Sequence, residues 1–141
     1  MWVLLLVFTL FVGEYIWLRV RHARHRAVGE EAERRLVGFA TALRNYAKEN
    51  LQRLPDSLDE LNLPGTDAVA YRPIPRLNLD EKLILVHDAS PVHKVIEFPM
   101  LRDGRGVIFC SGRLHIVSED VFDKLRAADD GLRERLGLEP V

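Results

Sequence analysis

MWVLLLVFTLFVGEYIWL, residues 1–18, is the stretch on which the fold prediction depends. It holds a single charged residue, Glu14, and no basic residue. As a helix rising ~1.5 Å per residue it would cover about 27 Å, close to the ~30 Å hydrocarbon layer of a membrane. A helix buried in a protein core is the alternative, but core helices are rarely apolar on every side. We therefore expect residues 1–18 to form a transmembrane anchor.

A basic segment, residues 19–26, directly follows this anchor, and we call it the collar. Its four arginines are Arg19, Arg21, Arg24 and Arg26. Basic residues beside a membrane helix contact anionic lipid headgroups and favour the cytoplasmic side. Aromatic residues do not alternate with these arginines as they do in single-strand-binding proteins, so we expect no nucleic-acid partner. The two segments together predict a single-pass protein of the cytoplasmic membrane.

The composition indicates one small domain behind the anchor. The chain has 141 residues and a formal net charge of -1, so no overall charge excess points to a polyanionic partner. Its single cysteine, Cys110, excludes an intrachain disulfide. Trp17 and Leu18 stand where a signal peptidase needs small residues, so we expect the anchor to be retained. Residues 27–141 then form one domain.

Apolar residues recur every three or four positions between residues 27 and 52, which predicts a helix continuous with the anchor. Gly29 is the expected hinge between membrane and domain, because glycine weakens a helix by ~1 kcal/mol relative to alanine. Pro55 ends this spine helix, since the residue before a proline is disfavoured in helical conformation. A short helix over residues 58–61 is then expected to turn the chain back towards the spine.

The remainder of the chain predicts a small antiparallel sheet and a final helix. Residues 83–86 read as a strand, and residues 106–110 and 113–117 read as a hairpin. Residues 87–104 are rich in polar residues and proline, which predicts a long loop with a weak edge strand inside it. A C-terminal helix is expected from residue 119 to about 128. The fold class is therefore α+β: a transmembrane helix continuing into a spine helix, with about three antiparallel strands packed on it.

Two stretches carry a resemblance to a known family. Residues 43–61 read LRNYAKENLQRLPDSLDEL, and residues 105–122 read RGVIFCSGRLHIVSEDVF. They resemble the elbow and the C-terminal hairpin of type IV pilins and type II secretion major-pseudopilin-like proteins that carry an H-x-DG signature. The resemblance implies a spine helix with a sheet laid on it and a structural role in an assembly. It also implies calcium for some members, and it is the only reason to expect a cofactor.

The processing motif of these families is altered here. Residues 8–10 match the start of their "FTLIE" sequence, but Val7 replaces the leader glycine and Val12 replaces the glutamate. Cleavage before residue 8 would leave about 11 apolar residues, ~16 Å of helix, which is too short to span a bilayer. We therefore expect an uncut anchor. In the hairpin, Ser111 and Arg113 replace the family's aspartate and histidine, so no role is carried over to them.

Four residues outside the collar are candidates for function. Glu14 lies inside the predicted anchor, where it could pair with a neighbouring helix or reach the headgroup layer; its place near the collar favours the second. His87, Asp88 and His93 could ligate a metal, because imidazole and carboxylate are common ligands. Their spacing matches no defined motif, and solvated loop side chains are the alternative.

The residues thus predict a non-enzymatic structural or assembly protein held in the bilayer. Its expected partners are lipid and other protein chains that meet it through the N-terminal helix, with no small-molecule substrate. The alternative is a membrane-tethered module that binds a ligand or metal through residues 87–104. The collar places the domain in the cytoplasm, whereas the pilin resemblance places it outside the cytoplasmic membrane, and the sequence does not decide between them.

Overall fold

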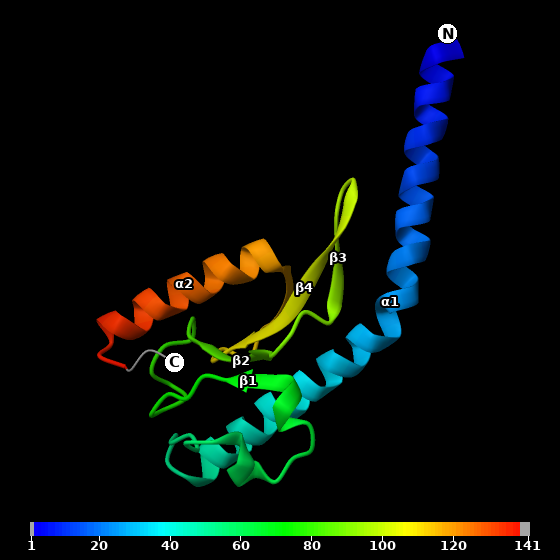
Figure 1. Cartoon of the computed structure of the whole chain (residues 1–141). Coiled ribbons are helices and arrows are strands. Elements are labelled where there is room, and N and C mark those ends of the chain that lie inside the picture. Colours follow the sequence, from blue (N-terminus) through cyan, green and yellow to red (C-terminus); the bar gives the residue numbers. More distant parts are fainter. Residues whose placement is uncertain (1, 139–141) are drawn as a thin grey trace.

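The computed structural model describes the backbone of residues 2–138 and the side chains of residues 7–138. The helices are α1 (Trp2–Glu49), two 3₁₀ helices (Leu58–Leu61 and Thr66–Ala68) and α2 (Glu119–Arg135). The strands are β1 (Val69–Tyr71), β2 (Ile84–Asp88), β3 (His93–Glu97), β4 (Met100–Phe109) and β5 (Leu114–Ser118). The fold is α+β, with a long N-terminal helix against an antiparallel sheet, a pilin-like arrangement (Figure 1).

Strand β4 organises the five-stranded sheet. Val107 of β4 pairs with both β2 and β5, and Gly104 of β4 pairs with both β3 and β5. Strands β2 and β3 therefore lie end to end along one edge of β4, while β5 lies along the other. β1 pairs with β2 at the outside. This arrangement brings the end of β2 next to the start of β3.

Helices cover both faces of the sheet (Figure 1). The core that contains the α1 side chains includes Leu36, Phe39, Leu43, Leu85 and Ile108. The core that contains the α2 side chains includes Ile84, Val107 and Phe122. Because both faces are covered, every residue of β2 is buried. An uninterrupted apolar run in the sequence, residues 83–86, correctly predicted this strand.

Helix α1 approaches β4 closely at one glycine. A Cβ atom on Gly106 would lie 2.4 Å from Cδ1 of Leu36, far inside van der Waals contact. Leu36 is fully buried at this point, so it cannot move aside without displacing the rest of the core. Glycine is therefore required where the spine crosses the central strand.

The turn after α1 confirms the predicted elbow. Ser57 caps the first 3₁₀ helix by accepting a hydrogen bond from the backbone N–H of Asp59. The carboxylate of Glu60 accepts in return from the N–H of Ser57, which completes a capping box. The hydroxyl of Tyr71 donates to the carbonyl of Pro55 at 2.8 Å and ties the elbow to β1.

Two predictions about the sheet were wrong. The sheet has five strands rather than about three. Residues 87–104 contain an edge strand, β3, as expected, but the rest is not a long loop, because it includes the end of β2 and the first half of β4. The arms of this hairpin are only partly buried, so charged residues are accepted there and hide the alternation that marks a strand. Pro99, which argued for a loop, lies in the turn, where it removes no hydrogen bond from the sheet.

Helix α2 also runs further than expected, to Arg135, because a buried ion cluster holds its C-terminal half. Asp129 Oδ2 lies 2.8 Å from Nε of Arg133 and 3.0 Å from Nε of Arg72. Asp129 Oδ1 accepts the backbone N–H of Ile84 at 2.7 Å. Arg133 is fully buried and also donates to the carbonyls of Pro73, Arg72 and Ile84. These contacts, the α2 clamp, join the helix to β2 and to the segment after β1.

The α2 clamp gives a stability prediction. Asp129→Asn keeps the shape of the side chain but leaves two buried arginines without their shared carboxylate, so we expect a loss of about 3–5 kcal/mol in the free energy of unfolding. Urea unfolding of the full-length protein followed by circular dichroism measures it. Asp123→Asn, on the exposed side of the same helix, is the matched control and should change stability by less than about 0.5 kcal/mol. Equal midpoints for the two variants would refute the role of the clamp.

Candidate functional site

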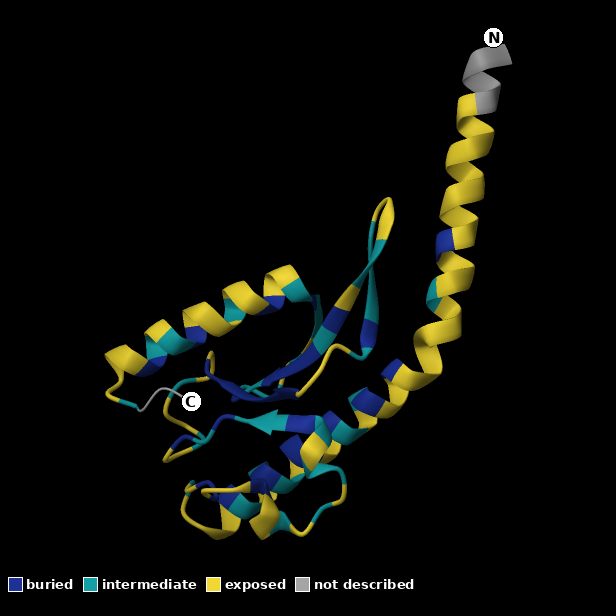
Figure 2. Ribbon diagram, in the orientation of Figure 1, coloured by how far each residue is buried: buried dark blue, intermediate teal, exposed yellow. Residues whose placement is uncertain are grey.

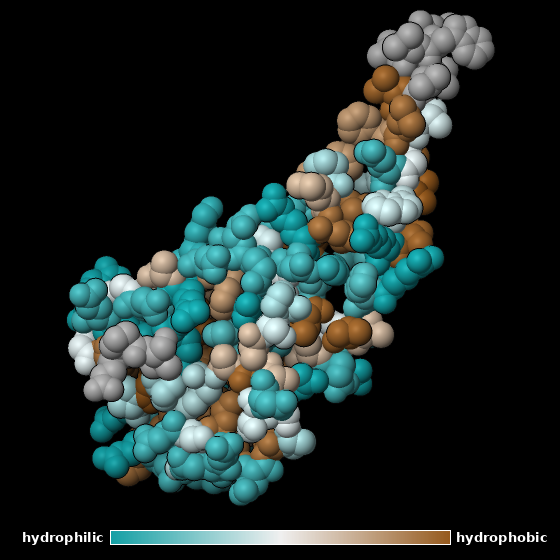
Figure 3. Space-filling view, in the orientation of Figure 1, coloured by the Kyte–Doolittle hydropathy of each residue, from teal (hydrophilic) through white to brown (hydrophobic). Residues whose placement is uncertain are grey.

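The N-terminal part of α1 extends beyond the sheet, and we call residues 7–20 the projecting segment (Figure 1). Its exposed large apolar side chains are Val7, Phe8, Leu10, Phe11, Val12, Tyr15, Ile16, Trp17 and Val20. Successive residues of a helix are turned by about 100°, so these side chains surround the whole helix. Figure 3 shows the hydrophobic colour gathered on this part of the molecule. Such an extended apolar surface indicates contact with lipid or with another apolar surface.

The first arginines of the collar turn back onto aromatic rings of the projecting segment. Arg19 donates from Nε to the hydroxyl of Tyr15 at 3.0 Å, and its guanidinium lies 5.4 Å from the ring centroid. The guanidinium of Arg21 lies 5.1 Å from the ring of Trp17. Tyrosine, tryptophan and arginine in this order are typical of the boundary between lipid and water.

The other predicted residues of this region are also exposed. Arg26 forms an ion pair with Glu30 at 2.7 Å on the surface of α1, while Arg24 is exposed. Glu14 is exposed on the projecting segment, so its carboxylate is free to face lipid headgroups or a neighbouring helix. The collar is thus a solvated cationic band around the helix.

Between residues 7 and 138, no helix has both the length and the apolar character that a membrane crossing needs. The first six residues of the predicted anchor lie outside the described side chains.

Two of the three metal candidates meet, in the interior. Nε2 of His93 lies 3.0 Å from Oδ2 of Asp88, and the same oxygen accepts the backbone N–H of Gly106 at 2.6 Å. Both side chains are buried, at 4% and 1% exposure. The edge of the imidazole that carries Nδ1 lies against α1, where a Cβ atom on Gly29 would be 3.0 Å from Nδ1. The pair is thus enclosed between α1 and β4.

The third candidate, His87, points elsewhere. Its ring packs edge-on against Phe122 of α2, with 4.8 Å between the ring centroids. Nδ1 lies 2.8 Å from the carbonyl of Asp88, and because a carbonyl only accepts, this nitrogen carries the proton. Among the described residues, no group of three or more His, Cys, Asp or Glu side chains is placed to hold a metal ion.

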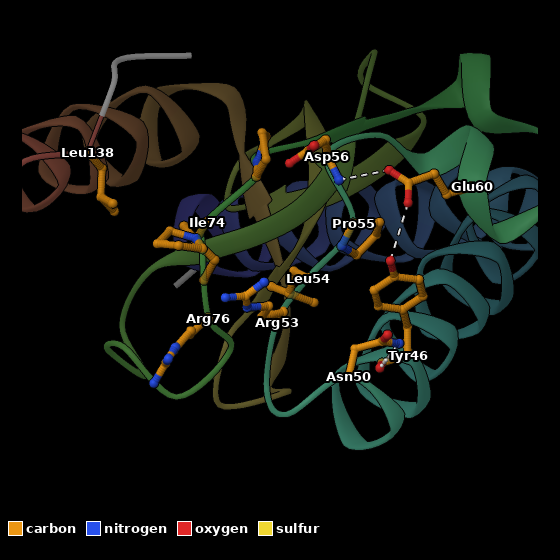
Figure 4. A pocket seen from close by; sticks show the side chains of 12 residues that line it. Tyr46, Asn50, Arg53, Leu54, Pro55, Asp56, Glu60, Ile74, Arg76 and Leu138 are labelled. Atoms are coloured by element: carbon orange, nitrogen blue, oxygen red, sulfur yellow. Dashed lines mark hydrogen bonds between the residues drawn. The ribbon is translucent and has the colours of Figure 1, made fainter.

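A cleft of about 720 Å³ opens beside the elbow (Figure 4). The hydroxyl of Tyr46 donates to Glu60 at 3.3 Å, and the backbone N–H of Asp56 donates to the other oxygen of that carboxylate at 2.9 Å. Partial desolvation and the carboxylate of Glu60 raise the pKa of Tyr46, so the phenol stays protonated as a donor. These polar groups hold the elbow in place, and they are not arranged as a nucleophile with its base.

Sequence interpretation missed the turn between β3 and β4. Phe98 and Met100 in this turn are both more than half exposed, and the ring of Phe98 lies beside that of Phe11 in the projecting segment. The available signal was the apolar group Phe98-Pro99-Met100 at a proline turn, where polar residues are usual. Its meaning depends on the partner helix, which is more than 80 residues away in the chain.

Comparison of the chain with protein-family models, with curated proteins and with solved structures finds no match.

The buried imidazole of His87 predicts a pH dependence of stability. Burial lowers the pKa of His87 below its ordinary value of 6.5. The hydrogen bond to the backbone of Asp88 raises this pKa in part, and the nearby cations of Arg105, Arg72 and Arg126 lower it further. The unfolded chain therefore binds the proton more readily, so this contribution to stability is present above about pH 6.5 and is lost as the pH falls.

Substitution of His87 isolates this effect. We expect His87→Gln to reduce the fall in unfolding free energy between about pH 7 and pH 5, by at most about 1.4 kcal/mol per pH unit. Urea unfolding of the two full-length proteins at a series of pH values measures the difference. Parallel curves for wild type and variant would show that His87 is not the group responsible.

Proposed function

We propose that this chain is a single-pass, membrane-anchored structural or assembly protein without enzymatic activity, similar in role to a type II secretion pseudopilin. The observation that carries the proposal is the projecting segment, residues 7–20, whose apolar side chains are exposed on every side of α1. Exposure of this surface to water is unfavourable, because the free energy falls when each apolar side chain leaves water.

The lipid bilayer is the proposed environment of this segment. The apolar run begins before it, since residues 1–6 are also apolar, and it ends at the collar. The arginine contacts with Tyr15 and Trp17 put aromatic rings and cations at one level of the helix, which supports a membrane boundary there. A retained anchor then holds residues 27–141 close to the membrane surface.

The conformation of residues 87–104, the proposed binding region of the alternative, favours the structural role. Residues 87–104 were expected to form a loop, but they form the end of β2 and the β3–β4 hairpin. His93 and Asp88 satisfy each other and the N–H of Gly106 inside the domain. Nε2 of His93 and Oδ2 of Asp88 therefore already have partners.

Deletion of the anchor and collar tests the proposal. Without residues 1–26 we expect the protein to leave the membrane fraction, whereas the full chain should resist extraction at alkaline pH. The deletion removes Leu18 but ends before the α1 residues of the main core, which begin at Leu36, so the domain should still unfold cooperatively by circular dichroism. Equal membrane retention of the folded deletion variant and the full chain would refute membrane anchoring by this segment.

Assembly through the N-terminal helix is tested by cross-linking. We expect Ile16→Cys, which places a thiol on the exposed projecting segment, to form disulfide-linked dimers in membranes on oxidation. Leu51→Cys is the matched control, because Leu51 is 86% exposed but follows the other end of α1. Non-reducing gel electrophoresis separates dimer from monomer. Monomer alone for both variants would exclude contact between copies at this level of the helix.

A further inference from the structure

The turn between β3 and β4 is apolar and exposed, and we call residues 98–100 the hairpin tip. Phe98 is 51% exposed and Met100 is 53% exposed, with Pro99 between them. Hairpin turns usually carry Gly, Asn, Asp or Ser, whose backbone freedom and polar side chains suit a solvated turn. Figure 2 shows the hairpin extending from the sheet, with its end coloured as exposed. The domain itself does not bury this apolar end.

The hairpin tip lies beside the projecting segment. The ring centroids of Phe98 and Phe11 are 6.1 Å apart, and their planes differ by 25°. Leu18 is only 2% exposed although its apolar neighbours along the helix are exposed. Leu18 lines one hollow together with Pro99 and Met100, which shows that the hairpin covers it. The hairpin therefore follows α1 towards the N-terminus of the helix.

The depth of the tip follows from helix geometry. Phe11 precedes Arg21 by ten residues, which is about 15 Å along the helix axis. Since the ring of Phe98 stacks on that of Phe11, this ring lies towards the proposed anchor from the level of Arg21, while Pro99 and Met100 line a hollow with Leu18. A bilayer that holds Phe11 therefore also surrounds Phe98.

The hairpin and the helix both carry a cation beside the hollow that they share. On α1 the change from apolar to charged residues comes at Arg19 and Arg21. On the hairpin the first charged residues after the tip are Glu97 and Arg102, which pair with each other. Lys94 lies further back, where it lines the same hollow as Arg21 and pairs with Asp103. Cations beside one hollow on two neighbouring elements, with apolar groups beyond them, match the headgroup layer of an anionic membrane.

Glu97 is the charged residue next to the tip, and its charge is compensated. Its carboxylate forms an ion pair with Nε of Arg102 at 3.0 Å, and Arg102 also pairs with Asp120 at the start of α2. The carboxylate thus faces the arm of the hairpin that leads back to the domain. It is therefore not an unpaired charge at the tip.

We propose that the hairpin tip enters the lipid bilayer beside α1 and forms a second membrane contact of this protein. The inference rests on the proposed anchor, because it takes the depth of the tip from the depth of the projecting segment. The ligand is a phospholipid bilayer with anionic headgroups: Phe98, Pro99 and Met100 meet acyl chains, and Lys94 meets headgroups. Two contacts fix how the domain is oriented on the membrane, which one helix does not.

Depth-dependent fluorescence quenching tests the proposal on the full chain. A bimane dye on Phe98→Cys reports on the tip, the same dye on Phe11→Cys reports on the anchor, and Leu51→Cys is the exposed control far from both. The vesicles contain phosphatidylethanolamine, phosphatidylglycerol and a lipid spin-labelled on its acyl chain. Burial raises the pKa of the Cys110 thiol to about 12, so the dye reacts with the introduced cysteine.

We expect several-fold stronger quenching at positions 98 and 11 than at position 51. Quenching at 11 without quenching at 98 would overturn the inference and leave the anchor standing. Absence of quenching at both positions would overturn the proposed anchor as well. A dye at 98 with blue-shifted emission but no quenching by lipid would show that another protein chain covers the tip, which also overturns the inference.

A second variant separates insertion from mere proximity. Met100→Asp adds a charge to the exposed tip, outside both hydrophobic core clusters, so the domain should remain folded. We expect it to remove most of the quenching at position 98 and to leave the quenching at position 11 unchanged. Met100→Leu is the matched control and should retain the quenching at both positions. Unchanged quenching at 98 in the aspartate variant would contradict insertion of the tip into acyl chains.

Discussion

The contact of Leu36 with Gly106 is the constraint on which the rest of this structure depends. It sets the spine helix directly on the central strand, at a distance that a side chain at residue 106 would not allow. Strands β2, β3 and β5 all take their register from β4. The direction of the β3–β4 hairpin relative to α1 is therefore fixed by this one crossing, and so is the position of the hairpin tip.

A buried polar pair marks the place where α1 leaves the sheet. His93 lies between Gly29 of the helix and Gly106 of the strand, and Asp88 accepts from both the imidazole and the Gly106 N–H. A side chain larger than hydrogen at residue 29 would push this imidazole away from Asp88. Gly29 is thus explained by close packing, whereas the sequence suggested only a weak point in the helix. Figure 1 shows α1 bending along its length rather than running straight.

The sequence predicted those elements whose signal is local. The spine helix, its elbow at Pro55 and the β4–β5 hairpin each have a periodicity or a turn residue that does not depend on distant partners. The β3–β4 hairpin and the α2 clamp lacked such a signal. No sequence prediction concerned Lys94 or Arg133, because their partners, Asp103 and Asp129, are identified only once the chain has folded. The polar pair of Asp88 and His93 was found as a set of candidate residues, but its enclosure by α1 was not.

The ion pairs near the projecting segment fit a domain that lies against an anionic surface. Acidic residues on the β3–β4 hairpin and at the start of α2 would repel phospholipid headgroups if their charges were free. Instead Asp103 pairs with Lys94, Glu97 and Asp120 pair with Arg102, and Glu119 pairs with Arg105. Exposed pairs of this kind add little stability, and here three cations offset the charge of most of these four carboxylates. The arginines of the collar then dominate the field at this end of the domain.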